Sequence, residues 1–271
     1  QGIKEVIVKI DKNIPTITDD YAYDDIWINH STGNINLTAH AGGSGLKDDP
    51  EAVKICGGDG CNPELGSGLY PSYNLSFNDE QNTTIRYQAY NELGVGSAIG
   101  EFRVKIDKTS PNTYESYGYN NTWHNENASI NIIESDLPDP NSGVNYTNYC
   151  VGSGCNPSTV YTGETVNFSS EGTSYLRYHS KDNAGNTQSL KEVIVKIDKQ
   201  NVSIANASVL IENGSTYSTD TTLNFNYSGF EDQAQLSGID GYYYDFSNNE
   251  GTTSGSWDTN QKGVLSGASQ G

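Results

Sequence analysis

The chain repeats itself, and this repetition limits its fold more strongly than any other feature of the sequence. Residues 3–12, 100–108 and 190–199 contain nearly the same alternating aliphatic segment. Each copy ends on an Asp-Lys pair, whose lysines are Lys12, Lys108 and Lys199. The period is therefore 96 residues and then 91 residues. Repetition at a nearly fixed period is typical of a tandem array of similar units.

Further markers recur at the same spacing. Trp27 and Trp123 lie 96 residues apart, and residues 84–94 align with residues 175–185 at an offset of 91. A Ser-Gly-aliphatic turn begins at three serines, Ser44, Ser142 and Ser237. The predicted units are the last strand of a preceding or neighbouring domain at 1–12, complete domains at 13–108 and 109–199, and a partial domain at 200–271 without its last two strands.

The repeated unit has the pattern of a β-sandwich. Short β-prone segments are separated by Gly, Asn, Asp and Pro, as in sandwiches and barrels. Val193, Val195 and Ile197 alternate along one segment, so one face of that strand is aliphatic and should pack inward. Units of 91 to 96 residues match the about 100 residues of an immunoglobulin-type domain. We therefore predict an all-β fold class of tandem immunoglobulin-like β-sandwich domains in a linear array.

The order of the markers resembles a known family. In the second unit the order is Trp123, Ser142-Gly-Val, Tyr149-Cys, Leu176-Arg-Tyr, Asp182-Asn-Ala-Gly-Asn and Val195-Lys-Ile-Asp-Lys. This order resembles the Ig-like repeats of bacterial and archaeal surface proteins, and the resemblance covers nearly the whole chain. The first unit departs at its last turn, which begins at Asn91, and the third unit has no cysteine. The resemblance implies a passive module of stalks, adhesins, surface layers or filaments.

The charge of the chain excludes two classes of partner. The net charge is -19, and nucleic acid and anionic membranes repel such a surface. No apolar run approaches the about 18 residues of a transmembrane helix. The sequence has no methionine, so we expect Gln1 to begin a processed form or a segment of a longer protein.

The four cysteines form one closely spaced pair in each of two units. The pairs are Cys56 with Cys61 and Cys150 with Cys155. Because the pair recurs, we predict a disulfide within each pair, in a small loop whose closure stabilises by about 2 kcal/mol. Zinc is the alternative, although its usual hooks are Cys-x2-Cys within one domain. Lasting disulfides favour an oxidising compartment, here extracellular or at the cell surface.

Asn-x-Ser/Thr sequons are abundant and predict a glycoprotein, although a chain rich in Asn, Ser and Thr also generates them by composition. The predicted sites are Asn29, Asn36, Asn74, Asn82, Asn120, Asn127, Asn145, Asn167, Asn201, Asn206, Asn213 and Asn226.

No combination of residues predicts catalysis, so the chain is predicted not to be an enzyme. The Gly-x-Ser-x-Gly pattern around Ser269 has no histidine after it and aligns with a turn of the second unit. The four histidines, His30, His40, His124 and His179, lie at different repeat positions without triad or metal spacing. No resident cofactor is predicted apart from the calcium considered next.

Carboxylates near the predicted linkers make calcium a candidate ligand. The candidates are Asp11, Asp107 and Asp198 at the ends of the repeated strands, with Asp136 and Asp139 in a loop. Each strand-end aspartate is followed by a lysine, which offers a counter-charge without a metal. Both interpretations stay open at this point.

The sequence favours a structural role in an extracellular, glycosylated surface array, fibre or filament. The alternative is an adhesin or carbohydrate-binding module, for which Trp257 and Tyr242, Tyr243 and Tyr244 would stack on cell-surface glycans. The expected partner is the chain itself, end to end, or its own continuation. Two interpretations of residues 1–12 stay open. They are either the last strand of a preceding domain in a longer array, whose domain boundaries differ from the ends of this sequence, or a strand donated to a neighbouring subunit.

Overall fold

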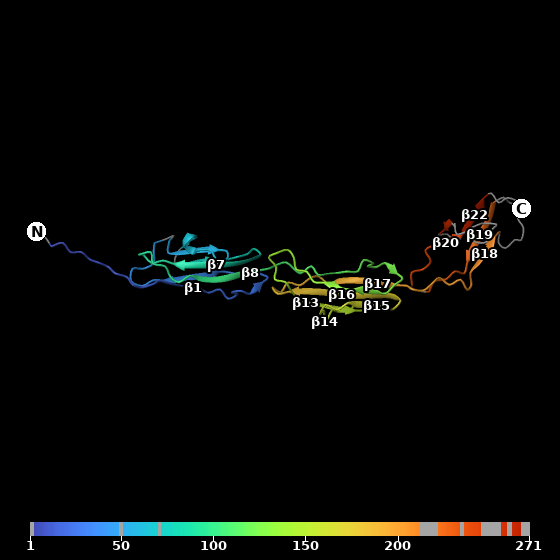
Figure 1. Cartoon of the computed structure of the whole chain (residues 1–271), viewed down its shortest axis with the longest axis horizontal. Coiled ribbons are helices and arrows are strands. Elements are labelled where there is room, and N and C mark those ends of the chain that lie inside the picture. Colours follow the sequence, from blue (N-terminus) through green and yellow to red (C-terminus); the bar gives the residue numbers. More distant parts are fainter. Residues whose placement is uncertain are drawn as a thin grey trace.

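A computed structural model describes residues 3–48, 51–69, 72–211, 222–233, 236–244, 256–258 and 262–266. Two sandwiches follow one another along the long axis, and a third group of strands follows them (Figure 1). The described ranges contain no helix with the length and apolar character that crossing a bilayer requires. The prediction of an all-β fold built from sandwich domains is confirmed.

The first sandwich consists of a three-stranded and a five-stranded sheet. The smaller sheet has the order β1 (Thr16–Asp19), β3 (Ile35–His40), β6 (Ser72–Leu75). The larger has the order β2 (Trp27–Ile28), β8 (Gly100–Ile106), β7 (Gln81–Ala89), β4 (Val53–Gly57), β5 (Ser67–Leu69). A short 3-10 turn, η1 (Pro63–Leu65), precedes β5. The pairs are antiparallel except β2 with β8, which is parallel.

Alternation along the strands produces the core. In β3, Ile35, Leu37 and Ala39 are buried while the residues between them are exposed. From the opposite sheet, Val104 and Ile106 of β8 enter the same hydrophobic cluster. Successive side chains of a strand point to opposite faces, so this period-two pattern sets which face of each sheet is inside.

The second sandwich repeats this arrangement. Its larger sheet has the order β10 (Trp123–His124), β17 (Lys191–Ile197), β16 (Gly172–Asp182), β13 (Val144–Val151), β14 (Thr159–Val160). Opposite it, β9 (Tyr114–Glu115) pairs with β12 (Ile132–Ile133), and β11 (Ala128–Ile130) pairs with β15 (Val166–Phe168). The strand order matches the first sandwich, including a parallel first pair, β10 with β17.

The third group contains β18 (Ser208–Ile211), β19 (Thr222–Ser228) and β22 (Lys262–Ser266) in one sheet. β20 (Tyr242–Tyr244) pairs with β21 (Ser256–Asp258) in another. At the opposite end, residues 3–12 are extended and, within the described part of the chain, belong to no strand. The domain boundaries inferred from the repeats stay a prediction.

Candidate functional site at the joints between repeats

The same contact joins consecutive units at three places. At the first joint, Asp11 Oδ2 accepts hydrogen bonds from Ser44 N at 2.8 Å and Ser44 Oγ at 2.6 Å. At the second joint, Asp107 Oδ2 accepts one from Ser142 N at 2.7 Å. At the third, Asp198 Oδ2 accepts from Ser237 N at 3.1 Å and from Ser237 Oγ. The aspartate at the end of one repeat thus binds the Ser-Gly-aliphatic turn of the next.

The other carboxylate oxygen of each aspartate holds the linker itself. It accepts a hydrogen bond from the backbone N–H two residues further along the chain, at Asn13, Thr109 and Gln200, over 2.8, 3.0 and 3.0 Å. This is the local bond by which Asp favours turns. Each aspartate therefore bends the chain directly after the strand and fastens it to the next unit.

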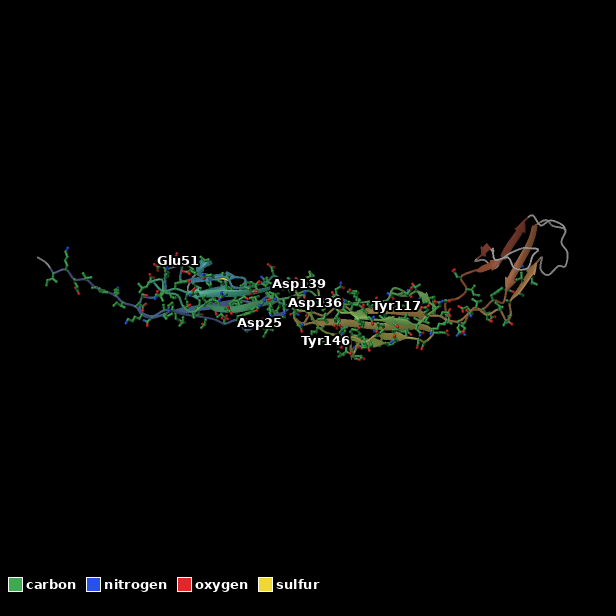
Figure 2. All side chains as sticks on the ribbon, viewed as in Figure 1. Asp25, Glu51, Tyr117, Asp136, Asp139 and Tyr146 are labelled. Carbon is green, nitrogen blue, oxygen red and sulfur yellow. A yellow bond between two sulfur atoms is a disulfide. The ribbon has the colours of Figure 1, made fainter. Side chains whose placement is uncertain are left out.

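The second joint carries a cluster of buried carboxylates. Asp107, at the end of β8, is 0% exposed, Asp136 in the loop after β12 is 8% exposed, and Asp182 at the end of β16 is 1% exposed. One oxygen from each lies within 4.8 Å of the other two. Figure 2 shows Asp136 in the region where the two sandwiches meet. Three segments that are distant in sequence thus place negative charge at one point.

The three aspartates of this cluster differ in their hydrogen-bond partners. Asp182 Oδ1 accepts from Gly185 N at 2.6 Å and Asn186 N at 2.7 Å, and its Oδ2 accepts from Asn186 Nδ2 at 2.8 Å. Both oxygens of Asp136 are buried and neither has a well-formed hydrogen bond in the part of the chain that the structure describes, although the Gly143 N–H lies close enough to lower its pKa slightly. Burial, and then the charges of Asp107 and Asp182, raise the pKa of the Asp136 carboxyl to about 6.

The lysines after the strand-end aspartates do not neutralise these carboxylates. Lys108 Nζ donates to Asn78 O, and Lys199 Nζ donates to Asn127 Oδ1 and to Ser169 O at 2.7 Å. The ion pairs found among the described residues include none of the three clustered aspartates. The interpretation of a lysine counter-charge is therefore wrong at these two joints, because each side chain bonds within its own repeat.

The predicted calcium candidates fall in different places. Asp107 and Asp136 lie together, whereas Asp11 and Asp198 occupy the other two joints. Asp139 is exposed and accepts a hydrogen bond from Asn141 Nδ2. Sequence reasoning missed Asp182, which it treated only as a turn residue. The alignment of the repeats held a usable signal, because the position of Asp182 is occupied in the preceding repeat by Asn91, 91 residues earlier.

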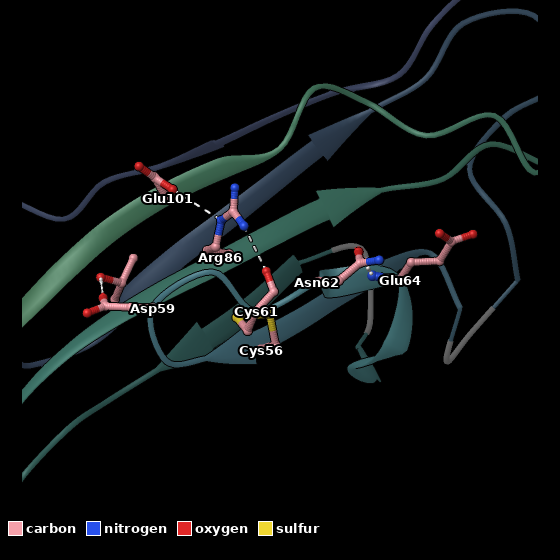
Figure 3. Close-up of a disulfide and its surroundings, with 8 residues drawn as sticks. Cys56, Asp59, Cys61, Asn62, Glu64, Arg86 and Glu101 are labelled. Carbon is pink, nitrogen blue, oxygen red and sulfur yellow. Dashed lines mark hydrogen bonds and ion pairs between the residues drawn. A yellow bond between two sulfur atoms is a disulfide. The ribbon is translucent and has the colours of Figure 1, made fainter.

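A disulfide closes a matching loop in each sandwich. Cys56 is bonded to Cys61 with a Cα–Cα distance of 6.1 Å, and Cys150 to Cys155 with 6.2 Å. In the first loop, Arg86 Nη1 donates to Cys61 O at 2.8 Å while its Nε lies 3.1 Å from Glu101 Oε2 (Figure 3). Arg177 does the same between Cys155 O and Glu192. The arginine of the neighbouring strand fastens each loop to the larger sheet.

Most sequon asparagines lie at the surface. Ten of those in the described ranges are exposed, namely Asn29, Asn36, Asn74, Asn82, Asn120, Asn127, Asn145, Asn167, Asn201 and Asn206. Asn226 is half-buried, and Asn213 lies outside the described residues.

The remaining candidates are the tryptophans and the residues named for glycan stacking or for the Gly-x-Ser-x-Gly pattern. Trp27 and Trp123 are half-buried, and Lys105 and Lys196 lie over their rings at 5.9 and 5.8 Å from the centroids. Trp257 and Tyr243 are backbone partners in the β20–β21 pair, but their side chains lie outside the described part, as does Ser269.

Comparison with known proteins finds similarity to solved structures. No family model and no curated protein matches the sequence. A solved structure of fibronectin(III)-like modules of CbhA from Clostridium thermocellum is similar, with 15% identity over 67% of this chain and 94% of that chain, and a TM-score of 0.27. A score this low adds nothing to the strand pairing described above, on which the assignment of sandwich domains rests.

Proposed function

We propose that the chain is a structural segment of an extracellular, glycosylated array or filament built from Ig-like repeats, and that it performs no catalysis. The observation that carries this proposal is the recurrence of one carboxylate-to-turn contact at three successive joints. A contact that fixes each unit on the next is useful to a protein whose task is to hold repeats in line. It has no role in an isolated binding domain.

The segment at residues 3–12 supports continuation of the array at its N-terminal side. Val8 is 74% exposed, whereas Val195, at the same position of the repeated sequence, is 0% exposed in the core of the second sandwich. The neighbouring positions behave alike, with Val6 and Ile10 exposed and Val193 and Ile197 buried. A strand with one aliphatic face loses favourable burial when it stands alone. We infer that it completes an Ig-like unit formed by preceding residues or by a neighbouring copy.

Two further features support an extracellular location. Both disulfides belong to small surface loops and persist only in an oxidising compartment. Exposed sequon asparagines on both sandwiches are accessible to glycosylation. The acidic surface, with a net charge of -19, keeps neighbouring fibres apart in solution.

The proposal is tested by the mass and shape of the native protein together with the behaviour of the purified chain. We expect electron microscopy of native material to show a linear array, and its intact mass to report whether the continuation is covalent. If the native polypeptide is this chain alone, sedimentation velocity should reveal end-to-end species. Val8→Asp should abolish those species. Lys4→Asp should not, because the corresponding position of the repeat is exposed in β17.

The outcomes separate cleanly. A native polypeptide much longer than this chain, with repeats in line, supports covalent continuation. A native polypeptide of this size that stays monomeric at all concentrations contradicts the array. The carbohydrate-binding alternative predicts glycan-array binding that Trp257→Ala abolishes, and such binding would replace the structural proposal with an adhesive one.

A further inference from the structure

We propose that Asp107, Asp136 and Asp182 bind one Ca²⁺, which locks the second joint. Asp107 comes from the first sandwich, while Asp136 and Asp182 come from the second. An ion held by all three therefore ties the two sandwiches to each other. Calcium binding at this joint needs no polymer, so it is independent of whether the chain continues as an array.

The spacing of the carboxylates fits a calcium ion. Ca²⁺–oxygen distances are about 2.3 to 2.6 Å, so ligands on opposite sides of the ion lie about 4.6 to 5.2 Å apart. One oxygen from each aspartate lies within 4.8 Å of the others, which is within that span. Water and backbone carbonyls commonly complete such a shell.

The chemistry of the ligands selects among metals. All the donors are carboxylate oxygens, with no cysteine or histidine in the cluster, so a hard cation is favoured over zinc. Mg²⁺ requires near-octahedral geometry at about 2.0 to 2.1 Å and retains most of its water. Three largely dehydrated carboxylates at this spacing therefore suit Ca²⁺ better.

The second, independent observation is the state of Asp136. The residue is 8% exposed, and neither of its oxygens has a well-formed hydrogen bond among the described residues, the Gly143 N–H being its one nearby donor. A buried carboxylate without a partner is costly, and two further carboxylates beside it increase the cost. A bound cation removes both penalties, because it supplies the missing partner and the missing charge. The raised pKa of Asp136 agrees with a carboxylate that lacks a neutralising charge beside it.

The first joint lacks the carboxylates that are proposed as ligands at the second joint. Asn91 stands in place of Asp182, and its Nδ2 donates to Asn13 O at 3.3 Å, so an amide joins repeat and linker without an ion. The loop before Ser44 contains Ala41, Gly42 and Gly43 and offers no side-chain oxygen. At the third joint, the nearest acidic residue before the serine turn is Asp232. Its Oδ2 accepts a hydrogen bond from Gly238 N at 2.6 Å, so, unlike Asp136, it has a well-formed hydrogen bond. We therefore expect one Ca²⁺ among the joints that the structure describes.

Calorimetry on the full chain tests the site. After treatment with EGTA and dialysis, titration with CaCl₂ should give one ion per chain with a Kd of about 10⁻⁴ to 10⁻³ M, the range of extracellular calcium modules. At ten times the Kd, Ca²⁺ should raise the Tm of the second sandwich by about 6 to 11 °C. Mg²⁺ at the same concentration should produce a smaller shift.

Two variants of one loop separate binding from folding. Asp136→Asn should weaken Ca²⁺ binding at least about 10-fold and abolish the Tm shift. In EGTA, its Tm should equal or exceed that of the wild type, because an unpartnered buried charge is gone. Asp139→Asn makes the same change of charge three positions away at an exposed site and should leave binding unaltered. No heat and no Tm shift in the wild type, or an equal Ca²⁺ response in Asp136→Asn, would overturn the site.

Discussion

The first and second joints perform the same task with different chemistry. In both, an aspartate at the end of a strand binds the serine of the next turn, Asp11 to Ser44 and Asp107 to Ser142. Around the first contact Asp11 and Ser44 are half-buried, and the side-chain amide of Asn91 donates to the linker. Around the second, the contact is buried among further carboxylates. The hydrogen bond is thus common to the joints, whereas burial and charge vary between them.

This difference shows that a repeat can retain its strand order while its joint changes character. Replacement of Asp182 by Asn91 exchanges a carboxylate that accepts three hydrogen bonds for an amide that both accepts and donates. The first joint therefore needs no counter-ion, and the second needs a cation. We expect the two joints to respond differently to the same substitution.

The largest expected effect follows from truncating the strand-end aspartate at the second joint. Asp107→Ala leaves the N–H groups of Thr109 and Ser142 without acceptors in a buried site, so the free energy of unfolding should fall by about 2 to 4 kcal/mol. Asp11→Ala, its counterpart, removes a carboxylate that is only half-buried and should cost less. Urea unfolding of both variants in saturating CaCl₂ measures the difference, and equal losses would show that neither burial nor calcium binding distinguishes the joints.

Removal of the disulfides should affect the two sandwiches equally. Replacing both cysteines of a pair by serine, at Cys56 and Cys61 or at Cys150 and Cys155, opens a small loop and should cost about 2 kcal/mol in each case. The loops have the same spacing and the same arginine support, unlike the joints. Thermal unfolding of the two double variants provides the measurement. A marked inequality would mean that the sandwiches differ beyond their joints.

A glycine at the first joint allows a smaller, more specific test. Gly43 has a φ of +64°, and a Cβ there would lie 2.2 Å from Asp11 Oδ1. Gly43→Ala should therefore cost about 1 to 2 kcal/mol in backbone strain and also displace the Asp11 carboxylate. Gly45→Ala is the control, since its φ is +88° but the space around it is open. If both variants lose the same stability, Asp11 does not depend on close approach to Gly43.

The smallest expected effect is the loss of the contact between Asp11 and Ser44 at low pH. Hydrogen bonds, first from the Ser44 hydroxyl and then from backbone N–H groups, lower the pKa of Asp11 from 3.8 to about 2. Because the folded pKa lies below the unfolded one, the contact stabilises fully above pH 3.8 and is lost as the pH falls through about 2. The NMR shift of the Ser44 amide should report this transition. A transition at pH 4 or above would mean that the carboxylate is not bound by Ser44 in solution.

The sequence predicted the fold better than the site. Periodicity identified the inward face of β17, and the structure buries Val193, Val195 and Ile197 there. The carboxylate cluster was only partly predicted, because Asp107, Asp136 and Asp182 come together through packing between two sandwiches. No local pattern encodes that proximity. The lysine counter-charge was wrong for a related reason, since neighbours in sequence need not share an environment and Lys108 bonds to Asn78 instead.

The joint contacts also determine where mechanical load acts. Tension along the chain passes from β8 through the linker at residues 107–113 into the second sandwich, so the linker straightens before either sheet is strained. The bonds that straightening must break include those that Thr109 N and Ser142 N donate to the Asp107 carboxylate and the one that Asn186 Nδ2 donates to Asp107 O. They can reform when tension ends, because the serine turn and the strand end stay folded. We therefore expect tension to lengthen the joints reversibly before it strains the sheets.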